Sequence, residues 1–319
     1  MKILVTGGAG FIGSNFVRLL LESTKFKESQ LLLLDAMTYA GNEKTLKELL
    51  INERIKFIKG NICDSELVSN STKEVDVVVN FAAESHVDRS IALPNEFIES
   101  NILGTHNLLF HSMKNNVKKF IQVSTDEVYG SIVNGSWDET KPLEPNSPYS
   151  ASKASADLIA RSYFQTYNFP VIITRCSNNF GPYQNLEKFI PKSITSALNG
   201  GPIEIYGNGT NIRDWIHVSD HCRALLLLID VGIAGEVYNI GSGNELSNLD
   251  LAKIISNLMN LPETDLKFVA DRKGHDQRYS VNYSKIEKLG FKPARDFHKL
   301  LGATIEWYKS NSNWWSQQN

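Results

Sequence analysis

Two short segments of the sequence carry side chains that can move protons. Asp126 and Glu127 are adjacent carboxylates, and a Tyr-x-x-x-Lys pair follows at Tyr149 and Lys153. Residues four apart share one face of a helix, so we expect the phenol and the ammonium to be neighbours. The ammonium would lower the pKa of Tyr149, which could then take a proton from a substrate hydroxyl. Repulsion between the two carboxylates in a desolvated cleft would hold one of them protonated, which suits an acid and base pair.

A glycine-rich turn near the start of the chain predicts a nucleotide site. Apolar residues at 2–6 predict a strand, and helical spacing of apolar residues covers 11–21. Between them stand Gly7, Gly10 and Gly13, and such small residues let the backbone turn tightly and approach a pyrophosphate at the helix N-terminus. Asp35 ends the next predicted strand, where it would accept from ribose hydroxyls and repel a 2′-phosphate. This favours NAD over NADP.

The elements that position these residues alternate regularly over the first half of the chain. Short apolar runs recur at 31–34, 56–58, 75–79, 120–123 and 171–174, each separated by a segment of helical length. This pattern predicts an α/β fold with a Rossmann-like, doubly wound parallel sheet. After residue 175 the rhythm changes, so we expect an NAD-binding domain over 1–175 and a smaller, interleaved α/β substrate-binding domain over 176–319. The buried run at 236–241 suggests that part of about 214–245 returns to the first domain.

Composition excludes several classes of partner. The 319 residues include 33 basic and 35 acidic side chains, for a formal net charge of -2, which gives no electrostatic footprint for nucleic acid or an anionic membrane. No apolar run is long enough to span a bilayer. Cys63, Cys176 and Cys222 fit no C-x-x-C spacing, and a reducing cytoplasm is the simplest interpretation. His217 and His221 are four apart but lack a third ligand, so we predict no metal.

Taken together, these segments resemble a known family, the extended short-chain dehydrogenases that act on nucleotide sugars, and among them most closely the dTDP-glucose 4,6-dehydratases. The resemblance runs over essentially the whole chain. It is carried by 34–42 (LDAMTYAGN), 82–90 (AAESHVDRS), 124–130 (STDEVYG), 149–153 (YSASK), 176–183 (CSNNFGPY), 212–215 (IRDW) and 271–276 (DRKGHD).

The resemblance implies a dehydration with dTDP-glucose as substrate and a tightly bound NAD that is regenerated in each turnover. Oxidation at C4 of the hexose acidifies the C5 proton, which Glu127 would remove while protonated Asp126 delivers a proton to the departing C6 hydroxyl. Hydride then returns to C6, leaving a 4-keto-6-deoxy sugar that could feed rhamnose or another deoxysugar. Thr125 would bind the C4 hydroxyl and assist Tyr149, and Lys153 would hold the nicotinamide ribose.

Further site residues follow from the motif positions. The cofactor set is Gly7, Gly10, Phe11, Ile12, Gly13, Asp35, Thr38, Asn61, Ile62, Ala82, Ala83, Ser100, Tyr149, Lys153 and Asn179. The substrate set is Ser85, Thr125, Asn178, Glu187, Lys188, Arg213, Asn248, Arg272 and His275. Asn61 stands where the family commonly has Asp, and Lys273 where it commonly has Pro, so fine nucleotide preference stays open.

Other functions remain open from the sequence. A nucleotide-sugar 4-epimerase or decarboxylase would use Tyr149 and Lys153 but would not need the pair Asp126 and Glu127. A dehydratase acting on CDP-glucose or GDP-mannose would leave little trace, because the base is hard to read from the sequence. A non-catalytic NAD-binding scaffold could lose Tyr149 and Lys153, whereas this chain keeps both. The family resemblance also implies a homodimer, formed through helices within 95–114 and 149–167.

Overall fold

The computed structural model describes residues 1–262, 265–271 and 274–316. Its largest element within them is a parallel sheet of seven strands in the order β10-β6-β5-β4-β1-β2-β3. The order reverses between β1 and β4, which is where doubly wound sheets open a crevice for ligands. The strands are β1 (Lys2–Thr6), β2 (Gln30–Asp35), β3 (Ile55–Lys59), β4 (Val77–Asn80), β5 (Lys119–Thr125), β6 (Val171–Cys176) and β10 (Val237–Ile240). The predicted fold class is confirmed.

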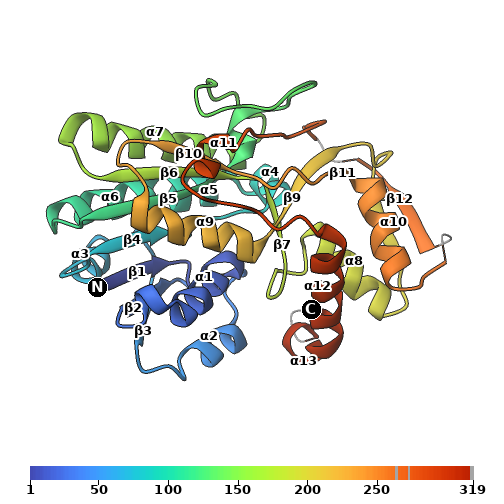
Figure 1. Ribbon diagram of the computed structural model, residues 1–319, viewed down its shortest axis with the longest axis horizontal. Coiled ribbons are helices and arrows are strands. Elements are labelled where there is room, and N and C mark those ends of the chain that lie inside the picture. The colour runs from blue at the N-terminus through green and yellow to red at the C-terminus, as the bar shows by residue number, and fades with distance from the viewer. Residues whose placement is uncertain (263–264, 272–273, 317–319) are drawn as a thin grey trace.

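Helices cover both faces of this sheet (Figure 1). One face carries α1 (Phe11–Glu22) and α9 (Val218–Val231), which contact each other and bury Phe16, Leu20 and Leu225 against the strands. The other face carries α3 (Ser65–Ser71), α6 (Thr105–Lys114) and α7 (Pro148–Tyr167). Shorter elements at the sheet are η1 (Thr24–Phe26), α2 (Glu43–Leu49), α4 (Val87–Ala92), α5 (Pro94–Phe97), η2 (Ile98–Gly104), η3 (Asp126–Tyr129) and α11 (Ser284–Glu287).

Local sequence explains the exact placement of α7. Ser147 is its N-cap and forms a reciprocal capping box with Ser150, while Pro148 occupies the first turn, where its missing N–H costs nothing. The helix ends at Asn168, whose φ of 53° is left-handed and stops further helical hydrogen bonding. Tyr149 and Lys153 are therefore fixed in the first turns of a well-capped helix.

The segment expected to be one helix over 95–114 is instead three pieces. α5 leads into η2, a π-helical stretch, which continues as α6. The wider turn of η2 produces no distinct spacing of apolar residues, so the sequence alone predicts one continuous helix here. π-helical turns are rare and concentrate at functional sites, and Ser100 lies within this one.

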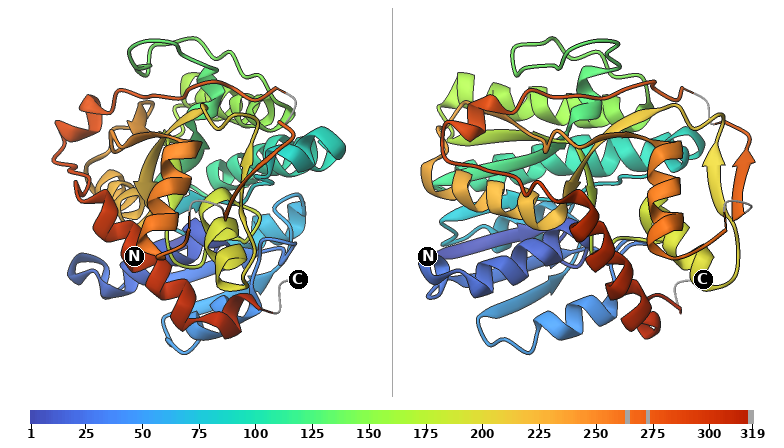
Figure 2. Two further views of the ribbon diagram at one scale, coloured as in Figure 1. Left: turned by 90° about the vertical axis from the view of Figure 1, so that its right-hand side faces the viewer. Right: turned by 45° about the vertical axis from the view of Figure 1, so that its right-hand side comes forward.

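The rest of the chain builds a smaller unit beside the carboxyl ends of the large sheet (Figure 2). It contains two small sheets, in the orders β11-β9-β7 and β12-β8, and its own core around Ile194, Trp215 and Leu251. Its elements are β7 (Asn178–Phe180), α8 (Phe189–Leu198), β8 (Ile203–Tyr206), β9 (Ile212–His217), β11 (Glu245–Ser247), α10 (Asn248–Leu258), β12 (Leu266–Val269), α12 (Phe297–Ser310) and α13 (Ser312–Trp315). Between β9 and β11 the chain returns to the large sheet through α9 and β10.

Candidate active site

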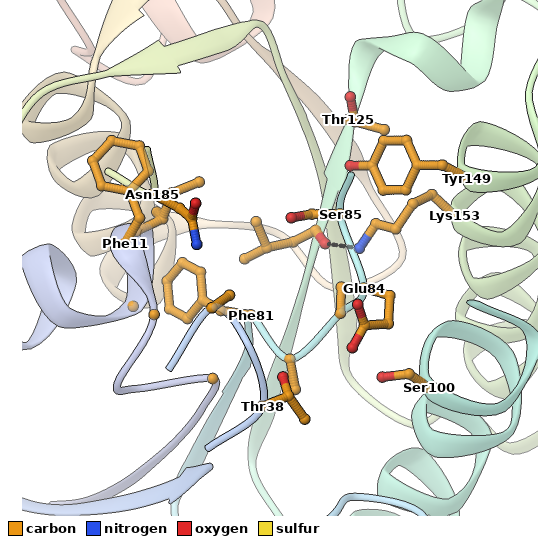
Figure 3. Close-up of a pocket in the computed structure, with 18 of the residues that line it drawn as sticks. Phe11, Thr38, Phe81, Glu84, Ser85, Ser100, Thr125, Tyr149, Lys153 and Asn185 are labelled. Carbon is orange, nitrogen blue, oxygen red and sulfur yellow. Dashed lines mark hydrogen bonds between the residues drawn. The ribbon is translucent and has the colours of Figure 1, made fainter. Parts of the chain in front are cut away.

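A cavity of about 570 Å³ lies at the carboxyl ends of the sheet strands, next to the smaller unit. Its walls come from the residues that end β1, β2, β4, β5 and β6, together with α7 and the segment around Asn185. Figure 3 shows Tyr149, Lys153 and Thr125 grouped on one side of it, with Phe11 and Phe81 on the other. Parallel strands bring these distant segments to one edge of the sheet.

The glycine turn is shaped by close backbone contacts. Gly7 has a φ of 67°, and a Cβ there would lie 2.8 Å from the Ala82 backbone nitrogen. A Cβ on Gly13 would collide with the Gly7 carbonyl oxygen. A side chain at either position would therefore collide with the backbone and force open the tight turn that places the N-terminus of α1 at the cavity. These residues fit a dinucleotide pyrophosphate, because the free N–H groups and the dipole of α1 favour an anion there.

We expect Gly13→Ala to abolish retention of NAD, because the new methyl group must displace the Gly7 carbonyl and reshape the turn. The ratio of nucleotide to protein absorbance after gel filtration measures the bound cofactor, and a thermal melt shows whether the fold persists. Gly302→Ala is the matched control, since a Cβ on this glycine of α12 meets nothing within 4 Å. A folded Gly13→Ala protein with wild-type NAD content would contradict the expectation.

Every residue predicted to contact the cofactor lines this cavity. The Asp35 carboxylate accepts from the backbone N–H groups of Ala9 at 2.9 Å and Met37 at 2.8 Å, which fixes it at the ribose position. Burial raises the pKa of Asp35, and these two backbone bonds lower it. Asn61 uses its carbonyl oxygen to accept from the Cys63 N–H at 2.9 Å, a turn that Asp could form equally well. The replacement of Asp by Asn thus leaves this loop intact.

Tyr149 and Lys153 both line the cavity and both are buried, with exposed fractions of 9% and 5%. The Lys153 ammonium donates to the Val123 carbonyl at 2.7 Å. The expected lowering of the Tyr149 pKa is wrong for this structure. Burial raises that pKa well above its usual value and the Glu127 carboxylate raises it further, while the Thr125 hydroxyl opposes the shift. The four-residue spacing of Tyr149 and Lys153 could not predict this upward shift of the pKa, because desolvation depends on the surrounding fold.

The two carboxylates differ sharply in environment. Asp126 is 3% exposed, whereas Glu127 is half-buried. Burial raises the pKa of Asp126 well above its usual range, and the charges of Glu127 and Asp214 raise it further. Its Oδ2 is buried without a hydrogen-bond partner among the described residues, while Oδ1 accepts from the Thr125 hydroxyl at 3.3 Å. Burial therefore favours the protonated form of Asp126, which is the form that a general acid needs.

The predicted substrate residues fall into two groups. Ser85, Thr125, Asn178, Glu187 and Lys188 line the cavity, and the Lys188 ammonium donates to the Ser85 carbonyl at 2.8 Å. Arg213, Asn248 and His275 lie outside that lining. Arg272, and Lys273 beside it, fall outside the residues that the structure describes.

Arg213 is buried in β9, where its charge reaches the Asp126 carboxyl. Its guanidinium donates to the carbonyls of Ile212 at 2.7 Å and Asp276 at 2.9 Å, and it lies 4.3 Å from the centre of the Tyr279 ring. Its positive charge lowers the pKa of Asp126, though less than burial raises it.

Several cavity residues were not singled out from the sequence, and three of them are the polar residues Tyr39, Glu84 and Arg89. Burial raises the pKa of the Glu84 carboxyl, and Arg89 partly offsets this. The Arg89 guanidinium lies 3.9 Å from the centre of the Tyr39 ring, which joins the loop after β2 to α4. All three stand inside segments that carry the family resemblance, and that was the available signal.

The two histidines four apart serve hydrogen bonds in the structure. His217 is the N-cap of α9, with Nδ1 2.8 Å from the Ser219 hydroxyl. His221 is fully buried, which lowers its pKa to about 3, and its Nδ1 lies 3.0 Å from the Asn179 side-chain oxygen. Neutral His221 thus orients a residue of the predicted cofactor set.

Comparison with known proteins gives the same picture over the full length of the chain. A family model described as GDP-mannose 4,6 dehydratase matches residues 4–304. A dTDP-glucose 4,6-dehydratase of Actinoplanes sp. is 49% identical, with 99% of this chain and 100% of the relative covered. A second, from Streptomyces antibioticus, is 47% identical over 99% of this chain and 94% of the relative. The crystal structure of the dTDP-glucose 4,6-dehydratase DesIV from Streptomyces venezuelae, with NAD and TYD bound, superposes with a TM-score of 0.98 at 48% identity, covering 100% of both chains.

The fold and cavity define an NAD-dependent enzyme built on a short-chain dehydrogenase scaffold. The chain belongs to the GDP-mannose 4,6 dehydratase family. The resemblance identified from the sequence is confirmed, and so is the expectation of NAD as cofactor.

Proposed function

We propose that this protein is a dTDP-glucose 4,6-dehydratase, which converts dTDP-glucose to dTDP-4-keto-6-deoxyglucose and water. One observation carries the proposal: the buried carboxyl of Asp126, whose pKa is raised by burial, stands beside Glu127 in the same cavity as Tyr149 and Lys153. A 4-epimerase has no use for such an acid, because its reaction eliminates nothing. The full-length relatives of 47% and 49% identity support the same substrate.

In the proposed reaction NAD, held by the glycine turn, Asp35 and Lys153, supplies a hydride acceptor and later returns the hydride. Tyr149, with Thr125 beside it, would take the proton from the C4 hydroxyl. Because burial raises the pKa of Tyr149, the positive charges of Lys153 and of bound NAD would have to stabilise its phenolate. Glu127 removes the C5 proton, which the neighbouring C4 ketone has acidified. Asp126, whose raised pKa favours the protonated form, would donate its proton to the C6 hydroxyl, which leaves as water. The hydride would then return to C6 as a proton returns to C5, which gives the 4-keto-6-deoxy sugar.

Substrate binding follows from the two groups of polar residues. Ser85, Asn178, Glu187 and Lys188 line the cavity and would contact the hexose and phosphates. Arg213 suits the diphosphate, because a guanidinium fork makes paired, charge-assisted bonds to phosphate oxygens. Arg272, which lies outside the described residues, would bind the diphosphate in the same way. Asn248 would add a hydrogen bond to the phosphate or sugar, and His275 would border the nucleoside.

Mass spectrometry of dTDP-glucose incubated with the purified protein in deuterated water, without added reductant, tests this function. Loss of one water with one deuterium entering at C5 is the expected result, since the hydride is returned internally and the C5 proton exchanges with solvent. GDP-mannose and CDP-glucose serve as comparison substrates. Turnover of either in place of dTDP-glucose would move the assignment to another dehydratase, and bound NAD with no turnover of any sugar would favour the scaffold.

The wider organisation follows the same proposal. The domains are 1–175 for NAD and mainly 176–319 for the nucleotide sugar, with the part around 214–245 returning to the first, as the pairing of β10 with β6 supports.

The keto sugar would enter deoxysugar biosynthesis, such as a route to dTDP-rhamnose. No described helix is both long and apolar enough to cross a membrane. The cytoplasmic location stays a prediction.

The exposed apolar residues on η2, α6 and α7 support a homodimer. Leu103 is 54% exposed, Phe110 39%, Leu158 58% and Tyr167 59%, and α6 and α7 lie side by side (Figure 1). Large apolar side chains gathered on neighbouring helices mark an association surface. A partner chain presenting the same helices would bury them in an isologous interface.

Leu158→Glu is expected to convert the dimer to a monomer, because it places a charge at the centre of an apolar interface. Light scattering after gel filtration measures the change from two chains to one. Ile51→Glu is the control, since Ile51 is 83% exposed between α2 and β3, and β3 is at the edge of the sheet away from β5 and β6, which α7 contacts. A Leu158→Glu protein that keeps the mass of two chains would contradict this interface.

A further inference from the structure

A buried ion pair lies below the active-site cavity and takes no part in the reaction described above. Asp157 is on α7, one turn after Lys153, and is 1% exposed. Arg175 is on β6 and is 5% exposed, and its Nε donates to Asp157 Oδ2 at 2.9 Å. Burying two charges costs several kcal/mol per ion, and a well-packed apolar pair is often at least as stable. A role beyond stability therefore needs consideration.

The pair is rigidly held from several elements. The Arg175 guanidinium donates from its NH1 to the Tyr129 hydroxyl at 2.8 Å, and that hydroxyl donates to the Asn239 side-chain oxygen at 2.8 Å. The chain of bonds links α7, β6, η3 and β10. Asp157 Oδ1 is buried and lies outside this ion pair. Burial raises the pKa of Asp157, and Arg175, Lys153 and the Ser124 side chain lower it, so the carboxylate interacts with Lys153 as well as with Arg175.

Lys153 is the group on which this charge acts. Its ammonium has one hydrogen bond given by the structure, to the Val123 carbonyl at 2.7 Å, in a site that excludes water. Burial lowers the pKa of Lys153, and the Asp157 carboxylate is the largest influence that opposes this shift, followed by Cys176. The titratable and charged groups around it come from three elements: Tyr149 and Asp157 from α7, Cys176 and Arg175 from β6, and Asp126 and Glu127 from η3.

We propose that Asp157, held in place by Arg175, is a positioning residue for Lys153 that keeps the ammonium charged and directed into the cofactor cavity. This inference rests on the role proposed above for Lys153. Arg175 fixes the carboxylate, and it also competes with Lys153 for the negative charge. The two members of the pair therefore act on Lys153 with opposite signs, which a purely structural ion pair would not do.

Substitutions at the two positions are expected to move the pH profile in opposite directions. Lys153 must be protonated, so its contribution is lost as pH rises through its pKa. Asp157→Asn removes the stabilising charge and lowers that pKa, so the alkaline loss of activity appears at a pH about 1 lower. Arg175→Met removes the competing cation, so the loss appears at a higher pH than in the wild type. Both single variants are expected to be less stable, because each leaves a buried partner unpaired.

The measurement is the rate of reduced nicotinamide formation in a single turnover, followed across pH by rapid mixing. This step precedes the one that uses Asp126. NAD retained after gel filtration at each pH gives a second readout, since the ammonium is proposed to hold the nicotinamide ribose. The double variant D157N/R175M removes both charges, so neither partner is left buried as an unpaired ion. We expect its alkaline loss of activity to occur at a lower pH than in the wild type.

Asp220→Asn is the matched control. Asp220 is another buried carboxylate, 1% exposed and paired with an arginine, but on α9. It should reduce stability and leave the pH profile in place. Identical alkaline limbs in the wild type and all the Asp157 and Arg175 variants would overturn the positioning role. A wild-type protein that reduces no nicotinamide with any nucleotide sugar would instead overturn the proposed function, so the two failures are distinguishable.

Discussion

Asp126→Asn is expected to stop the reaction after the sugar has been oxidised. The variant keeps the size and polarity of the side chain but has no proton to give to the C6 hydroxyl. Loss of a general acid slows its step by about 10²–10⁴-fold. The oxidation relies on Tyr149 and Lys153, so reduced nicotinamide should form at the normal rate and accumulate. Rapid mixing with dTDP-glucose, followed by absorbance of the reduced cofactor, measures both phases.

The physical reason lies in the burial of this carboxyl. Asp126 must hold its proton to act, and burial raises its pKa in the direction that favours this form, so activity is expected to fall as pH rises through that pKa. Asp138→Asn is the control, because Asp138 is an exposed carboxylate engaged with Thr140 at 2.6 Å and 2.8 Å. Dehydration at the wild-type rate by Asp126→Asn would assign the acid to another group.

The sequence predicts the scaffold of this site well because parallel strands impose it. Each apolar run became a strand of the large sheet, and the residues after those runs meet at one edge. Gly7, Asp35, Ala82 and Thr125 are far apart in the chain, yet they line one cavity for this reason. The positions of the motifs in the sequence were therefore enough to predict that these residues line one site, without knowledge of any tertiary contact.

Properties that depend on burial could not be predicted in the same way. The direction of the Tyr149 pKa shift was wrong, since the burial of the phenol and the nearness of Glu127 arise from the folded cavity. Which of the two acids is protonated was equally undecided from adjacency, and the deep burial of Asp126, which raises its pKa, is a property of the folded structure. The π-helical turn at Ser100 and the ion pair of Asp157 also leave no periodic trace.

Tyr149→Phe should block the reaction before any oxidation. The substitution removes only the hydroxyl, and the ring keeps its edge contact with Phe97, whose centre lies 6.2 Å away. Fold and NAD content should therefore be unchanged. Without a group to take the C4 hydroxyl proton, formation of reduced nicotinamide is expected to fall by about 10²–10⁴-fold, with little change in substrate affinity.

Comparison of the two variants separates the halves of the reaction. Asp126→Asn should accumulate reduced nicotinamide, and Tyr149→Phe should form almost none, when both are mixed with dTDP-glucose under the same conditions. Tyr163→Phe is the control on the same helix, since Tyr163 is 5% exposed and its hydroxyl contacts His106 at 3.2 Å, outside the cavity lining. If Tyr149→Phe oxidised the sugar at the wild-type rate, the proton acceptor would have to be sought elsewhere in the cavity. Glu127 would then be the first group to test, because it is the neighbouring carboxylate that raises the Tyr149 pKa.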